Sequence, residues 1–482
     1  MKRVENVGLD FFGGGCSNPF PALETLHFWD MPEWEDWSPF EVDEEVQAFA
    51  HLSELCIQSC PNLLGKLPNS LPCLRKLEIQ KCPQLVVEWL PSPTMIHHKR
   101  NTLQFSSVTS LSLSDVSILD SIPNQEVGDE VLATAACKHL SSVTDMRTEN
   151  IQKLICLPRW FFHGFTGLQE LRIHNCEELT TLCQNEVKLQ HKLPAPALQH
   201  LEIENCPQLV SLFEEEEDSP QLQRQQQEQE GSPYLMGLMY LGIDNCEKLE
   251  KLPGGLHALK CLQKMKVQNC PSLTRGGLPA ALEQLDIAHL SKLESLLAED
   301  DALQELSPTG VLSRTFSLTI DTIMIGKPPS EWGLHKLPSL RKLLLNGSKD
   351  CRWESISEDG MLLPTSLIYL SFQYFPNLEK LSFKDFQDLT SLEELVIYYC
   401  RKLTSLPKEG LPPSLLYLWI LGCPKFASFP EQGLPPSLLC LDIKGCPILK
   451  KRCQKGKGRY WRFISHIPRV DIDGKFILDA SC

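Results

Sequence analysis

The sequence predicts an α/β repeat protein, a curved solenoid with a parallel concave β-sheet and a mostly irregular convex side. Its apolar residues recur as Leu-x-x-Leu-x-Ile-x-x-Cys-x-x-Leu-x-x-Leu, for example from Leu168 to Leu182 and from Leu392 to Leu406. About sixteen copies begin between Leu23 and Leu438, at a mean spacing of nearly 28 residues. This period and pattern are those of a leucine-rich repeat.

Each copy predicts one short strand. In Leu-x-Ile the alternation of period two puts both apolar side chains on one face of a strand. A single unit cannot bury that face alone. The units are therefore expected to stack and to form one parallel sheet along the array.

Cysteine and proline follow the same register. Twelve of the 35 prolines come directly after Leu and six after the repeat Cys, so they are expected in turns on the convex side, outside the sheet. The repeat Cys is expected to be a small buried side chain with a weak S–H donor. Nine of the 20 cysteines occupy this position: Cys60, Cys82, Cys176, Cys206, Cys246, Cys270, Cys400, Cys423 and Cys446.

The repeats suggest a simple domain organisation. Residues 1–19 form an N-terminal segment, 20–450 the solenoid and 451–482 a C-terminal cap. Polar insertions are expected near 122–139, 214–233 and 299–314. The cap would cover the last repeat with Trp461, Phe463, Ile464, Ile467 and Val470.

A basic run from Lys450 to Arg462 leads into this cap. Two interpretations of it stay open, a solvated segment of the cap or a patch for anionic lipid or nucleic acid. The first is favoured.

Composition excludes several classes of function. The net charge of −15 disfavours a nucleic-acid partner for the whole chain, and no apolar run is long enough to span a membrane. The N-terminus has no apolar signal segment, so a cytoplasmic protein with reduced cysteines is expected.

The sequence also lacks the usual catalytic and ligand-binding motifs. It has no Cys-x-x-Cys pair for a metal, and no Gly-Lys pair is followed by Ser or Thr, so ATP or ADP binding is not encoded. No catalytic motif was found, and we expect neither an enzyme nor a cofactor.

Two stretches resemble a known family. The segment LTSLPKEGLPPSLLYLWILGCPKFASFPEQGLPPSLLCLDIKGCPILKKRC is similar to the C-terminal repeats of plant coiled-coil NB-LRR disease resistance proteins. The tail from Gly458 to Pro468 resembles the way these proteins end, and the stretch from Phe20 to Trp37 resembles a segment inside their repeat region.

The resemblance implies an intracellular immune receptor whose repeats recognise a pathogen effector or a guarded host protein. Such receptors carry a coiled-coil domain and a nucleotide-binding domain ahead of the repeats, and this chain has no P-loop and no room for either. We therefore expect either a truncated receptor or a relative that consists of repeats only.

A binding surface is expected on the exposed strand face, at positions two, four, six and seven after the first Leu of each unit. In the middle units these positions are polar: Arg172, His174, Glu202, Glu204, Asp244, Lys266, Gln268 and Asp286. Towards the C-terminus they become aromatic or apolar: Tyr369, Tyr374, Val396, Tyr398, Tyr399, Tyr417, Trp419 and Leu421. Such residues dominate interface energetics, so these eight are predicted to bind a protein ligand. Alternatively, several of the rings simply pack on one another along the sheet.

Two other functions stay open. A repeat-only adaptor, such as the substrate-recognition subunit of a ubiquitin ligase, would need an F-box ahead of the repeats, and only about twenty residues precede Leu23. An extracellular receptor domain would carry Asn at the repeat Cys position, and no unit does.

Overall fold

A computed structural model describes most of the repeat strands of the chain. The described residues are 3–7, 20–37, 49–64, 71–85, 107–116, 140–157, 161–183, 198–213, 235–252, 259, 261–274, 282–288, 316–321, 334, 340–347, 351, 353–356, 363–381 and 389–479. The three insertions expected near 122–139, 214–233 and 299–314 lie outside them. The chain divides into two compact units, unit 1 (Met1–Leu262) and unit 2 (Gln263–Cys482), each described by itself below.

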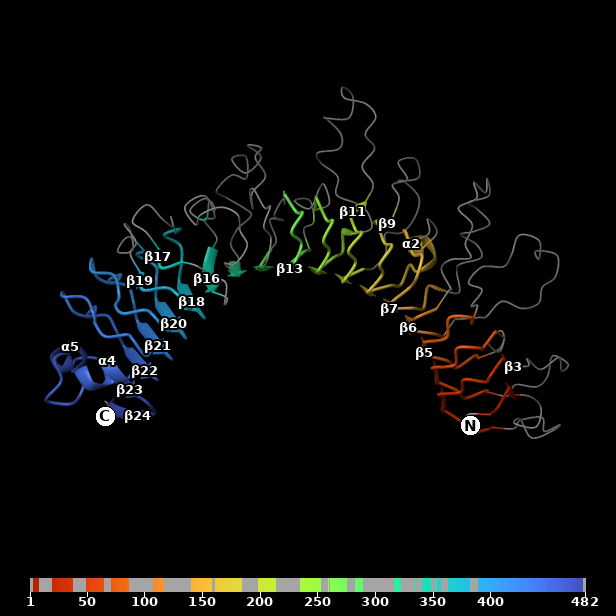
Figure 1. Ribbon diagram of the computed structural model, residues 1–482, viewed down its shortest axis with the longest axis horizontal. Coiled ribbons are helices and arrows are strands. Elements are labelled where there is room, and N and C mark those ends of the chain that lie inside the picture. The colour runs from red at the N-terminus through yellow and green to blue at the C-terminus, as the bar shows by residue number, and fades with distance from the viewer. Residues whose placement is uncertain are drawn as a thin grey trace, which may run out of the picture. The chain divides into compact units, whose positions relative to one another are not determined.

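In unit 1, parallel strands pair in chain order, each with the strand of the next repeat (Figure 1). They are β2 (Thr25–Trp29), β4 (Glu54–Gln58), β5 (Lys76–Gln80), β6 (Ser110–Ser114), β7 (Asp145–Glu149), β8 (Glu170–His174), β10 (His200–Glu204) and β12 (Tyr240–Asp244). Short parallel pairs lie away from this sheet, β1 (Asn6–Val7) with β3 (Asp36–Trp37) and β9 (Thr181–Cys183) with β11 (Ser211–Phe213). The helix α2 (Phe161–Gly164) is a single turn.

Unit 2 continues the same pattern. Its strands are β13 (Lys264–Gln268), β14 (Gln284–Ala288), β15 (Phe316–Asp321), β16 (Leu340–Asn346), β18 (Tyr369–Gln373), β20 (Glu394–Tyr398), β21 (Tyr417–Leu421) and β22 (Cys440–Lys444). A short parallel pair of this unit joins β17 (Ser355–Ile356) to β19 (Lys380–Leu381). Each of the sixteen predicted copies thus carries a strand, and the predicted fold class is confirmed.

The core of each unit is made by the repeated apolar positions. In one complete copy all six are 0% exposed: Leu198, Leu201, Ile203, Cys206, Leu209 and Leu212. The two residues from the strand face inward, because alternate side chains of a strand point to opposite sides of the sheet. The other four lie outside the strand in the same repeat. All six are buried because the neighbouring repeats stack against them.

The repeat cysteines behave as predicted. All nine are at most 1% exposed. Each Sγ donates to the carbonyl of the last strand residue, as from Cys206 to Glu204 at 3.5 Å and from Cys446 to Lys444 at 3.3 Å. The interaction with Cys423 raises the pKa of the Cys446 thiol well above its usual range.

The prolines after these cysteines lie in turns. In four Cys-Pro-x-Leu segments the Leu N–H donates back to the Cys carbonyl, as from Leu209 to Cys206 at 3.1 Å and from Leu273 to Cys270 at 3.2 Å, whereas after Cys446 the helix α4 begins. Proline suits the second position of such a turn because its φ is already fixed and no N–H is needed there.

A residue whose backbone adopts the left-handed conformation, with positive φ, follows most strands. In unit 1 these residues are Asp30, Ser59, Lys81, Asp115, Asn150, Asn175, Asn205 and Asn245, with φ between 51° and 57°. Their N–H groups continue the strand ladder, as from Asn175 to the Glu204 carbonyl at 2.9 Å. Asn and Asp adopt this conformation more readily than other side chains do.

Unit 2 ends in two short helices and a hairpin. The helices are α4 (Pro447–Arg452) and α5 (Trp461–Ile464), and β23 (Arg469–Ile472) then pairs in parallel with β22. The last strand, β24 (Lys475–Asp479), runs antiparallel to β23 after a two-residue turn at Asp473 and Gly474, both at positive φ. Ile464, Ile467 and Val470 are buried here, at the positions expected for a cap.

Candidate functional site

The candidate site is the exposed sheet face of unit 2 at β18, β20 and β21. Side chains at alternate strand positions face outward there, opposite the buried Leu and Ile residues. The strand register places Val396 beside Trp419, and Tyr398 beside Leu421. The fold therefore brings these predicted residues side by side on neighbouring strands.

Three tyrosines form a ring cluster at the ends of these strands. The Tyr374 ring lies 5.2 Å from the Tyr398 ring and 5.9 Å from the Tyr399 ring, and the last two are 4.6 Å apart. Contact with Tyr374 raises the pKa of the Tyr398 phenol. The next strand end carries Gly422 at φ +67°, where a Cβ would come within 3.0 Å of the Tyr399 ring. Glycine at this position therefore leaves room for Tyr399.

None of the eight predicted residues is buried. Tyr374, Tyr399 and Tyr417 are 51%, 43% and 37% exposed. The other five are half-buried: Tyr369, Val396, Tyr398, Trp419 and Leu421. Some of the rings do pack on one another, as the alternative interpretation held, and Glu394 lies between Tyr369 and Tyr417 in the strand register. Their role in binding stays a prediction.

The next strands place two carboxylates beside this surface. Asp442 is the register partner of Trp419 and of Asp471, and the two aspartates are 4% and 6% exposed. Lys444 Nζ lies 2.8 Å from Asp442 Oδ2, whereas Asp442 Oδ1 and Trp419 Nε1 are buried without a hydrogen-bond partner among the described residues.

The equivalent face of unit 1 is mostly polar, although β2 also carries Trp29 there, which is 73% exposed. The Arg172 guanidinium lies 3.1 Å from Asp145, 2.6 Å from Glu170 and 3.6 Å from Glu202, so one cation bridges carboxylates from three adjacent strands. Another ion pair joins Lys76 to Glu54 at 2.6 Å. Arg172 and Glu202 therefore bind one another, whereas His174 Nε2 and His200 Nε2 are buried without a hydrogen-bond partner among the described residues.

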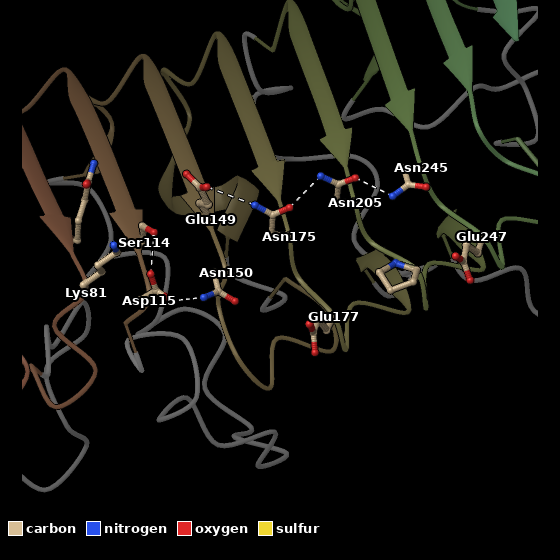
Figure 2. Close-up of a pocket in the computed structure, with 12 residues that line it drawn as sticks. Lys81, Ser114, Asp115, Glu149, Asn150, Asn175, Glu177, Asn205, Asn245 and Glu247 are labelled. Atoms are coloured by element: carbon tan, nitrogen blue, oxygen red, sulfur yellow. Dashed lines mark hydrogen bonds between the residues drawn. The ribbon is translucent and has the colours of Figure 1, made fainter. Parts of the chain in front are cut away.

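An amide ladder runs along the strand ends of unit 1 (Figure 2). Asn245 Nδ2 donates to Asn205 Oδ1 at 2.7 Å, Asn205 Nδ2 donates to Asn175 Oδ1 at 2.9 Å, and Asn175 Nδ2 donates to Glu149 at 3.3 Å. Asn150 donates to Asp115 in the same way. The ladder sits in an open groove of about 580 Å³. Its amides bind one another, so we interpret it as a structural feature of the turns.

In the part of the chain that the structure describes, no three His, Cys, Asp or Glu side chains group in a way that could hold a metal ion. No helix among the described residues is long and apolar enough to span a membrane.

Sequence reasoning missed two features of these surfaces. One is the amide ladder, which could have been found from the Asn that precedes the repeat Cys in four units: Asn175, Asn205, Asn245 and Asn269. The other is the pair of buried aspartates, whose signal is an Asp at the central outward position of two successive strands.

The strands, the turns and the buried columns define the chain as a leucine-rich-repeat protein. Residues 163–294 match the family model for the leucine-rich repeats of RPS2-like plant disease resistance proteins. The chain is also similar to two Arabidopsis thaliana proteins named as disease resistance proteins. At3g14460 is 25% identical over 85% of this chain and 40% of its own length, and RPP13-like protein 1 is 28% identical over 38% and 16%.

These matches confirm the resemblance to the leucine-rich-repeat region of plant disease resistance proteins. The chain spans less than half the length of these relatives. Solved structures with similarity include a leucine-rich-repeat protein of Leptospira interrogans, 16% identical with a TM-score of 0.30, covering 76% of this chain and 90% of that one. Another is the leucine-rich-repeat domain of the type III effector XopL, 19% identical with a TM-score of 0.25, covering 46% and 72%.

Proposed function

We propose that the chain is the recognition region of a plant intracellular immune receptor of the coiled-coil NB-LRR class. It binds a protein, either a pathogen effector or a guarded host protein, in the cytoplasm. It carries out no catalysis. The similarity to disease resistance proteins supports the role in defence. We propose the recognition of a protein ligand in addition to that role.

The observation that carries the proposal is the aromatic surface of unit 2. The eight residues cover three adjacent strands and none of them is buried. Exposed tyrosine and tryptophan rings lose little conformational entropy on binding and bury a large area, so they are enriched among the residues that dominate interfaces. On the equivalent face of unit 1, the Arg172 guanidinium is already bound by three carboxylates.

The test is a two-hybrid screen of the chain against plant and pathogen coding sequences, followed by binding measurements with the purified pair. Replacing Tyr398 and Trp419 together with Ala should weaken binding by about 2 kcal/mol or more, the range of interface hot spots. The matched control is Glu204→Gln, on the exposed face of unit 1, which should bind as the wild type does.

Two results would overturn the binding surface. The first is that the partner binds the double variant as tightly as it binds the wild type. The second is that the Glu204→Gln control loses as much affinity as the double variant does. Circular dichroism of each variant separates lost binding from lost folding. The receptor assignment is tested separately, by looking for an in-frame nucleotide-binding domain upstream of Met1 in the gene.

A further inference from the structure

A basic groove lies beside α4 in unit 2. It is an open groove of about 620 Å³, lined by Pro447, Ile448, Lys451, Arg452, Lys457, Gly458 and Arg459. Four of these seven residues are cationic and none is acidic. The groove is well separated in sequence from the aromatic strands, and nothing in the proposed function uses it.

The charge here contrasts with that of the whole chain. The run from Lys450 to Arg462 contains seven Lys and Arg residues and no Asp or Glu, within a chain of net charge −15. Lys450 is neutralised by Asp473, since its Nζ lies 2.6 Å from the carboxylate. Lys451 and Lys457 are exposed and make no ion pair within the described residues. Two cations of the groove are therefore available to a ligand.

The backbone holds the walls of the groove in place. Arg452 Nη1 donates to the Ala427 carbonyl at 2.9 Å, and the Tyr460 N–H donates to the Arg452 carbonyl at 2.9 Å. Gly458 closes the turn between them, because a Cβ there would collide with the Arg452 carbonyl. The cations are thus carried by a preformed turn, which lowers the entropy cost of binding.

We propose that this groove binds a small ligand with two or more phosphate groups, either free in solution or as a lipid headgroup. The guanidinium of Arg452 or Arg459 suits bidentate contact with phosphate oxygens, and Lys451 and Lys457 supply compact charges. An open groove of about 620 Å³ has room for a small polyphosphate. Because the chain as a whole is acidic, the local cations must provide the attraction.

The experiment uses the whole chain and two probes. Inorganic pyrophosphate is titrated by calorimetry, and vesicles of phosphatidylcholine with and without phosphatidylinositol bisphosphate are tested by co-sedimentation. The double variant Lys451→Gln, Lys457→Gln should weaken binding at least about tenfold, since it removes two charge-assisted contacts. The control Lys455→Gln, Lys475→Gln loses the same charge outside the groove and should change affinity by at most about twofold.

The outcomes show whether the groove binds phosphate groups and whether the ligand is soluble or a lipid headgroup. Binding of pyrophosphate indicates a soluble ligand, and binding only to the phosphoinositide vesicles indicates a headgroup, provided that the groove variant alone loses it. The proposal fails if neither probe binds at low salt, or if the groove variant and the control lose equal affinity. It also fails if a single-stranded RNA binds more tightly than pyrophosphate. Both variants replace exposed lysines, so their melting curves should match that of the wild type.

Discussion

In unit 1 the exposed sheet face is held together by ion pairs and amide hydrogen bonds, whereas at the end of unit 2 the same positions carry tyrosine and tryptophan. Arg172 bridges three strands through carboxylates. Tyr374, Tyr398 and Tyr399 connect two strands through ring contacts. Beneath both faces lies the same layer of buried Leu, Ile and Cys.

The difference shows that the outer chemistry is independent of the fold. Strand pairing and burial of the inner layer suffice to build each unit, because the outward side chains take part in neither. Polar groups that bind one another leave little for a partner, whereas exposed rings leave a surface that gains free energy on burial. The comparison therefore favours unit 2 as the binding unit.

The largest expected effects test the shared inner layer. Leu201→Ala in unit 1 and Leu418→Ala in unit 2 should each lower the free energy of unfolding by about 2–5 kcal/mol, because each leaves a cavity in a packed core. Both residues are 0% exposed. Urea unfolding, followed by circular dichroism, measures the loss. A loss several times larger in one unit than in the other would show that the inner layers are not equivalent.

An intermediate effect on the free energy of unfolding is expected at the left-handed position after each strand. This position is Asn205 in unit 1 and Gly422 in unit 2. Asn205→Ala should cost about 1–3 kcal/mol, from the left-handed backbone and the lost ladder hydrogen bonds. Asn205→Gly should cost less, because glycine relieves the backbone part. If the two variants were equally unstable by thermal unfolding, the backbone would not be the reason for Asn.

Gly422→Ala provides the comparison in unit 2. It should be destabilised by about 1–2 kcal/mol through the same backbone conformation. Its new Cβ should also displace the Tyr399 ring, which near-ultraviolet circular dichroism can detect. An unchanged aromatic signal would argue against the contact between these residues.

The smallest expected effect is the loss of stability of unit 1 at low pH, when Glu54 is protonated. Lys76 holds the pKa of Glu54 below its ordinary value of 4.5, so this pair stabilises unit 1 above pH 4.5. As the pH falls through the lower folded value, Glu54 is protonated and that contribution, below about 1 kcal/mol for a partly exposed pair, is lost. Hydrogen exchange at β4 and β5 should accelerate there, and Glu54→Gln should remove the pH dependence of this step. Equal acceleration in the variant would assign the effect to other carboxylates.

Much of the fold could be predicted from the sequence because its signal is repeated. Each strand was located from Leu-x-Ile, and the Cys-Pro turns follow from the fixed φ of proline. The exposed positions were located by alternation alone, since a strand offers only two faces. This is why Tyr398 and Trp419 were expected on the outward strand face, where both are half-buried.

Other features depend on contacts that one repeat does not encode. The pairing of β9 with β11 joins neighbouring units, and its three-residue strands give little periodicity. Asp473-Gly474 is a dipeptide typical of hairpin turns, but the hairpin lies outside the repeat pattern from which the other strands were predicted. The basic groove needs the turn at Gly458 to bring Lys451 and Lys457 to the same place, and sequence shows only a run of charges.

The left-handed position after each strand has a consequence for how such a protein can change. Asp, Ser, Lys, Asn, Tyr and Gly all occupy it in this chain while its N–H keeps the same role in the ladder. Exchanges there alter what the surface offers to a partner and leave the buried layer untouched. A lineage could therefore explore new specificities by single substitutions at this position, at a modest cost in stability for each one.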